Sequence, residues 1–406
     1  MFKSIFLAIS ILIFVAACTS DVEFKAKDIE GVPIADLSNT YSYVKDTPYN
    51  EDIAACIQPV FEVDLCTLET LPFIGMDTDT PSVSDIMSRL VVSHDWMGER
   101  FEAVLDALPT EMLPLFKAVT AVVIDDDIRP AYYTRGTGAI YLDPAYLWLS
   151  TDDKRTINLK PDYRSNFGSE LSFEFEFLYL NEDGDNAFSY GNLFDDSTRE
   201  LDDIILLVSR LLLHELAHAN DMILPTDYAQ LDSINTAYYE LSQREEVWLS
   251  TNLKQDMPLT SSTMFRIASI LHLGTTAEIE DIHLTASEVA EAFDPDGATH
   301  TYSYASQFED LAMLFEMSMM KYFYNIDSSN SFYDLDENTV WSAFNRVGAS
   351  QVKVRAEYIA SEILNETDLT VFFQNYPDVV YENSPTSSSL RSSINSKGSA
   401  STIPYL

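Results

Sequence analysis

Basic residues are scarce in this chain of 406 residues. Lysine and arginine together number 24, against 65 aspartate and glutamate residues, so the formal net charge at pH 7 is −41. Such a charge repels the phosphates of nucleic acids, and we therefore expect no nucleic acid partner. An acidic, well-solvated surface accounts for the charge. Hydrophobic residues still make up 46% of the chain, which allows a sizeable core and argues against a disordered protein.

Long apolar runs are also rare. The most apolar internal stretch, residues 204–213, follows Asp203 and is interrupted by Arg210, which indicates a buried core helix rather than a membrane span. The apolar run at residues 5–15 is too short to cross a bilayer and comes after a lysine. A basic start followed by a short apolar run is typical of a signal peptide that directs export.

Small residues precede the first cysteine, in the order Val15-Ala16-Ala17-Cys18. This sequence resembles the bacterial lipobox. The resemblance implies that residues 1–17 are a lipoprotein signal peptide and that a lipid (palmitate) on Cys18 anchors the protein to a membrane of the cell envelope. Thr19, where inner-membrane lipoproteins carry Asp, implies the outer membrane if the cell is Gram-negative. The alternative is an ordinary secretory signal with an incidental cysteine.

Cysteine is the third scarce residue, with three in the chain. If Cys18 carries a lipid, Cys56 and Cys66 remain as a pair in an oxidising compartment, where a disulfide is expected. The alternative is two buried free thiols. A metal site at these cysteines is not expected, because no histidine or further cysteine lies near them in the sequence.

The chain divides into four predicted parts, without an internal repeat. After the signal peptide we expect a linker and disulfide-stapled segment at 18–80, one larger domain at 81–375, and a Ser-rich disordered tail at 384–406. Period-2 and β-branched patterns predict strands at 119–124, 131–133, 139–142 and 172–180. Helical periodicity predicts helices at 84–108, 111–117, 197–222, 228–254, 260–273, 285–293, 307–324 and 350–365.

Histidine occurs six times, and two of the six stand in the motif His214-Glu215-Leu216-Ala217-His218. Residues four apart lie on the same helix face, so both imidazoles can bind one tetrahedral zinc ion. Glu215 lies beside them and can take a proton from a water molecule. The alternative, two histidines packed in a core helix, leaves polar side chains without partners among aliphatic neighbours. We expect His94, His272, His283 and His300 to be surface or hydrogen-bonded residues, with His283 as the reserve ligand.

A catalytic zinc site needs a third protein ligand. Asp221 follows His218 by one turn, which places it about 4.5 Å further along the helix axis and favours a role in orienting a histidine ring. Glu309 has two interpretations. It can form a capping box with Ser306 at the start of a helix, or it can reach the zinc from a second helix packed on the first.

The segment His214 to Asp221 (HELAHAND), followed downstream by Glu309-Asp310-Leu311-Ala312, resembles the gluzincin-type zinc metallopeptidases. These include the anthrax lethal factor catalytic domain and uncharacterised bacterial zincin lipoproteins. The resemblance implies that Glu309 is the third ligand, that Tyr302 stabilises the oxyanion, with Tyr304 as the alternative, and that Asp310 supports the ligands. Met313 departs from the pattern, because many relatives carry a second glutamate there, and Glu316 is a possible substitute.

The resemblance also implies an α+β, zincin-like fold, with a small twisted sheet on the active-site helix and a mainly helical C-terminal half. An edge strand would bind extended substrate, and residues 139–142 are our candidate, with an ordinary buried strand as the alternative. The predicted activity is zinc-dependent hydrolysis of peptide bonds in a protein or peptide substrate. The other classes are a non-catalytic zincin-scaffold lipoprotein acting in envelope binding or assembly, and a periplasmic zinc-binding module.

Overall fold

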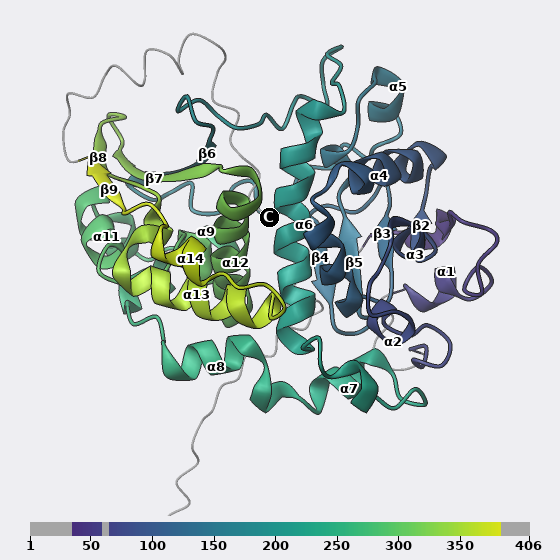
Figure 1. Ribbon diagram of the computed structural model, residues 1–406. Helices are drawn as coiled ribbons and strands as arrows, with labels where there is room; N and C mark the ends of the chain where they lie inside the picture. Colours follow the sequence, from purple (N-terminus) through teal and green to yellow (C-terminus); the bar gives the residue numbers. More distant parts are fainter. Residues whose placement is uncertain (1–34, 59–64, 383–406) are drawn as a thin grey trace, which may run out of the picture. The chain divides into compact units, whose positions relative to one another are not determined.

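The computed structural model describes residues 35–58 and 65–382, and its helices and strands are drawn in Figure 1. The chain is α+β with two small sheets, which confirms the predicted class. The signal peptide, Cys18, the first part of the predicted linker and the Ser-rich tail lie outside the described residues. Within them, no helix combines the length and the hydropathy needed to cross a membrane.

The first sheet has five strands in the order β1-β2-β3-β5-β4. Its three central strands are parallel, and the two outer strands pair antiparallel with them. The strands are β1 (Tyr41–Ser42), β2 (Leu90–Val92), β3 (Val122–Ile124), β4 (Tyr132–Thr134) and β5 (Ala139–Leu142). The predicted hairpin of β4 and β5 is confirmed, but the edge strand is β4. The strand predicted at 139–142 is present, but it is the ordinary buried strand of our alternative and not an edge strand, because β5 pairs with β3 on its other side and is fully buried.

The predicted helix 84–108 was also wrong as a single element. It consists of α3 (Val83–Met87), strand β2 and α4 (Asp95–Ala107). Leu90 fits the helical spacing of its neighbours, but it begins a strand whose three residues are all buried. A short, continuously apolar run buried on both faces is typical of a parallel central strand and cannot be told from a helix by periodicity alone.

The N-terminal segment folds together with the rest of the chain. The described residues 35–58 and 65–382 belong to one compact unit, in which β1 joins the first sheet. The segment also contains α1 (Ile53–Cys56) and α2 (Ile74–Asp77). The predicted disulfide between Cys56 and Cys66 is present, with an S–S distance of 2.01 Å.

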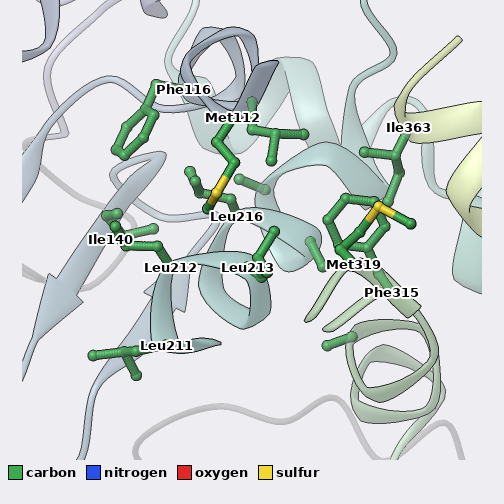
Figure 2. Close-up of a cluster of buried hydrophobic side chains, with 14 of the residues drawn as sticks. Met112, Phe116, Ile140, Leu211, Leu212, Leu213, Leu216, Phe315, Met319 and Ile363 are labelled. Carbon is green, nitrogen blue, oxygen red and sulfur yellow. The ribbon is translucent and has the colours of Figure 1, made fainter. Parts of the chain in front are cut away.

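Helix α6 (Asp202–Met222) contacts both the first sheet and α12 (Gln307–Tyr324). Its side chains are buried along almost the whole length because both faces are covered. Figure 2 shows leucines of α6 among apolar residues from both sides, including Ile140 of β5 and Phe315 of α12. Buried apolar area of this extent is the main force that holds such a helix pair in place.

The second sheet is antiparallel, in the order β6-β7-β8-β9. It comprises β6 (Phe173–Leu180), β7 (Asp327–Asp334), β8 (Thr339–Phe344) and β9 (Val380–Glu382). Only β6 was predicted; β7, β8 and β9 are strands in a C-terminal half that is otherwise mainly helical, as expected. The β7 sequence DSSNSFYD is rich in small polar residues, and five of its eight residues are nevertheless buried between β6 and β8.

The remaining helices agree with prediction in most places. The helix predicted at 228–254 is an exception, because it is divided into α7 (Ala237–Ser242) and α8 (Leu249–Asp256), with a 3-10 segment at Glu245–Val247 between them. The helical stretch predicted at 111–117 is present as a 3-10 helix (Thr110–Ala118). The other helices are α5 (Thr151–Lys154), α7 (Ala237–Ser242), α8 (Leu249–Asp256), α9 (Ser262–Leu273), α10 (Ile279–Ile282), α11 (Ala286–Phe293), α13 (Ser350–Ile363) and α14 (Thr370–Gln374).

Candidate metal centre

His214 and His218 lie one turn apart on the face of α6 that meets α12. Their Nε2 atoms are 3.2 Å apart, and the ring planes are nearly perpendicular. His214 is 2% exposed, and His218 is more open. Two convergent imidazoles on one helix face are the arrangement that the spacing of the motif predicted.

Glu309 comes from the first turn of α12. Its Oε2 lies 3.2 Å from His214 Nε2 and 3.5 Å from His218 Nε2. The backbone N–H of Glu309 donates to Ser306 Oγ, so Ser306 caps the helix. A capping box would bring the Glu309 carboxylate back to the Ser306 backbone. The carboxylate points to the histidines instead, and these three residues form the group of the described chain that can hold a metal ion.

The spacing and chemistry of the three donors fit zinc. Bonds of about 2.0–2.2 Å at tetrahedral angles separate neighbouring ligand atoms by about 3.3–3.5 Å. The observed separations of 3.2, 3.2 and 3.5 Å are close to this. Glu215, which is 2% exposed, has an Oε2 atom with no hydrogen-bond partner in the described residues. A buried carboxylate oxygen without a donor indicates a nearby positive group or water.

Glu316, fully buried on α12, orients His214. Its Oε2 lies 2.8 Å from His214 Nδ1, and its Oε1 accepts hydrogen bonds from Arg210 Nε at 2.9 Å and from the Tyr179 hydroxyl. A carboxylate at Nδ1 keeps the proton there and leaves the lone pair of Nε2 facing the other ligand atoms. Glu316 therefore occupies the supporting position that Met313 cannot fill.

The charges around the site are unbalanced. With both imidazoles neutral, the three carboxylates of Glu215, Glu309 and Glu316 outnumber the single guanidinium of Arg210 by two negative charges. Burial disfavours the protonated form of His214, but the hydrogen bonds that it donates to Glu309 and Glu316 outweigh burial and raise its pKa to about 10. A divalent cation would supply the missing positive charge and displace that proton.

Glu215 has the environment of a general base. Burial raises the pKa of its carboxyl above the ordinary value, against the opposing effect of the two histidines. A raised carboxyl pKa brings proton affinity closer to neutral pH, where a base of this kind works best. The orphan oxygen of Glu215 can therefore both attract a water molecule and accept its proton.

Of the two tyrosines considered, Tyr302 lies at the centre. Its ring stacks against that of His214 with 6.3 Å between centroids and 14° between planes. Burial, with the nearby Glu309 carboxylate, raises the pKa of Tyr302 well above its ordinary value, so the hydroxyl keeps its proton and can donate. Tyr304 instead donates to Asp296 Oδ2 at 3.0 Å and is 2% exposed.

Asp221 and Asp310 are both buried, and the contacts of Asp310 differ from the prediction. Asp221 Oδ1 accepts the Ser250 N–H at 2.7 Å, and its Oδ2 has no partner in the described chain. Asp310 pairs with Arg355 through both oxygens. In these contacts Asp310 supports the packing of α12 on α13 and does not orient a histidine, which corrects its predicted place beside the ligands.

The sequence interpretation missed Arg210 and Tyr179, which complete the surroundings of Glu316. Arg210 had one available indication, since it precedes His214 by one turn in an otherwise aliphatic helix and needs a buried acid as partner. No feature of the sequence indicated Tyr179, because it lies on β6, 137 residues from Glu316 in sequence. His283, the reserve ligand, lies at the end of α10 and is absent from the described metal group.

Comparison with protein family models, with curated proteins and with solved structures gives no match to this chain.

Proposed function

We propose that this protein is a zinc-dependent peptidase, exported and held at a membrane by a lipid on Cys18. The observation that carries the proposal is the convergence of His214, His218 and Glu309 from two helices at zinc-ligand spacing, with an unpartnered Glu215 oxygen beside them. The α+β arrangement of a small sheet on α6 is compatible with a zincin-like fold. Zinc, when bound, supplies Lewis-acid polarisation of a carbonyl and makes water a usable nucleophile near neutral pH.

The proposed function assigns a separate role to each of the protein's own residues at the site. Glu215 accepts a proton from the attacking water and returns it to the leaving amine. The Tyr302 hydroxyl donates a hydrogen bond to the carbonyl oxygen as negative charge develops on it. Glu316, held by Arg210 and Tyr179, keeps His214 in the required tautomer and orientation.

An extended peptide is the substrate that suits this site. Strand β4 contacts α6 and pairs with β5 on one side, and no further strand pairs with its other edge among the described residues. Extended chains bind such edges through backbone hydrogen bonds. Tyr133 of β4 lies close enough to Asp221 for the two side chains to interact electrostatically. Because Asp221 is three residues after His218 on α6, strand β4 lies near the C-terminal end of the HExxH segment.

The test is cleavage of an unfolded protein by the zinc-loaded chain, with and without a chelator. Glu215→Gln removes the proton acceptor without removing a ligand, so we expect full zinc content and a fall in hydrolysis of at least ~10². Glu102→Gln, at an exposed position of α4, is the matched control and should behave as the wild type. A wild-type protein that binds zinc but cleaves nothing would favour the non-catalytic scaffold.

The membrane anchor needs a separate test. Cys18→Ser should move the exported protein from the membrane fraction to the soluble fraction, because a lipid supplies the anchoring free energy. Equal partitioning of wild type and variant would contradict the anchor and leave the proposed activity unaffected.

A further inference from the structure

His300 caps the turn that carries Tyr302. Its Nδ1 accepts the backbone N–H of Tyr302 at 2.8 Å, at the start of the 3-10 helix Thr301–Tyr304. Short side chains such as Ser, Asp and Asn usually make this bond. A buried imidazole in their place is larger, so the surrounding structure must hold its ring. His300 is 2% exposed, and the capping bond therefore depends on its neighbours.

The second sheet holds the His300 ring. Phe175 and Phe177 of β6 contact it edge to face, each with 4.9 Å between centroids. Burial lowers the pKa of His300 well below its ordinary value, so the imidazole stays neutral and Nδ1 retains the lone pair that accepts the Tyr302 N–H. The aromatic contacts of β6 thus fix the backbone of Tyr302 through His300.

His272, on α9, holds the ring of Tyr302. The two rings meet at 62° with 4.9 Å between centroids, while the His214 ring lies parallel to Tyr302. His272 Nε2 also lies 3.2 Å from Thr301 Oγ1, which fixes the imidazole against the same turn. Tyr302 is therefore held at its backbone by one histidine and at its ring by another, and these contacts come from different elements.

We propose that His300 and His272 are positioning residues that hold the Tyr302 hydroxyl at the metal centre, without contact to substrate. The catalytic consequence rests on the proposed function, whereas the positioning itself does not. The inference links the second sheet to the site: β6 orients His214 through Tyr179 and Glu316, and orients Tyr302 through His300. A displacement of about 1 Å in a group of this kind can cost about 10² in rate.

Two variants at one position separate the capping bond from packing. His300→Asn keeps a hydrogen-bond acceptor at the N-cap, and His300→Phe keeps an aromatic ring but removes the acceptor. The probe is the ¹⁹F resonance of 3-fluorotyrosine placed at position 302 in the full zinc-loaded chain. We expect one narrow resonance in the wild type and in His300→Asn, and a shifted or broadened resonance in His300→Phe.

Kinetics supply the second measurement. His300→Phe should lower kcat by about 10²-fold with KM and zinc affinity nearly unchanged, and His300→Asn should recover most of the loss. If His300→Phe fails to fold, His272→Leu tests the ring contact, and we expect it to broaden the ¹⁹F resonance. An unchanged resonance in the folded variants would overturn the proposal. If the resonance responds but Tyr302→Phe keeps full activity, positioning stands and the oxyanion role of Tyr302 fails.

Discussion

Glu309 and Asp310 are neighbours in the first turn of α12, yet their carboxylates enter two buried charge clusters of opposite character. The Asp310 cluster consists of Asp310, Arg355 and the backbone oxygens of Met257 and Gly297. The metal-centre cluster consists of His214, Glu215, His218, Glu309 and Glu316, with the Arg210 guanidinium bonded to Glu316. Both clusters contain charged side chains that are buried or partly buried, so burial alone does not distinguish a functional site from a structural one.

The two clusters differ in whether each buried polar atom has a hydrogen-bond partner. In the Asp310 cluster, Arg355 Nε donates to Met257 O at 2.9 Å, and Nη1 donates to Gly297 O at 2.8 Å and to Asp310 Oδ1 at 3.1 Å. Arg355 Nη2 also contacts Asp310, so both of its carboxylate oxygens have donors. In the metal-centre cluster, three ligand atoms face one another and Glu215 Oε2 faces no donor in the described chain. The hydrogen bonds of the first cluster are complete without a ligand, whereas the second has donor atoms that could hold a metal ion.

The largest expected effect is a loss of folding stability when the Asp310 cluster is broken. Asp310→Ala leaves the buried Arg355 guanidinium without its partner, and we expect it to lower the free energy of unfolding by about 3–5 kcal/mol. The neighbouring Glu309→Ala should lower it by less in metal-free protein, because that carboxylate pairs with His214 and His218, and His214 keeps Glu316 as a second carboxylate partner. Urea denaturation with a chelator present measures both. Equal losses in the two variants would remove the distinction between the clusters.

A smaller effect, a loss of zinc affinity, is expected when Glu316 of the metal-centre cluster is changed. Glu316→Gln keeps the size of the side chain but weakens the acceptor at His214 Nδ1, so zinc affinity should fall by about 10–100-fold. Competition with a chelator of known affinity gives the value. Asp310→Asn, on the same helix but outside this cluster, is the control and should bind zinc as the wild type does. Undiminished affinity in Glu316→Gln would show that His214 does not depend on this carboxylate.

Asp221 lies between the two extremes, since one of its oxygens is bonded and the other is not. Burial raises the pKa of Asp221 to about 6, so the folded state holds a proton that the unfolded state releases near pH 4. Its contribution to stability is therefore present below pH 4 and is lost as the pH rises through 6. Asp221→Asn should remove this slope, which amounts to about 3 kcal/mol for a pKa raised from 3.8 to about 6, in unfolding measurements between pH 4 and 7. A slope that persists in the variant would assign it to another group.

The same contrast explains what the sequence could predict. The HExxH helix, the capping of α12 by Ser306 and the disulfide depend on local spacing or simple counting, and all are present in the structure. Glu309 came from a resemblance, and the fold brings it to the histidines. The partner of Asp310 was missed because Arg355 is 45 residues away, and the β7–β8 hairpin was missed because its small polar residues become buried only through pairing with β6. Long-range pairing of this kind leaves little periodic pattern in the chain.

The central claim is that His214, His218 and Glu309 bind one zinc ion together, and zinc content measures it most directly. Wild type, Glu309→Ala and Asp310→Asn are loaded with zinc, dialysed against a weak chelator and analysed for metal per folded chain. We predict about one zinc per chain for the wild type and for Asp310→Asn, and nearly none for Glu309→Ala, since the third protein ligand is lost. A Glu309→Ala protein that retains as much zinc as the wild type, or a wild type that retains none, would contradict the account.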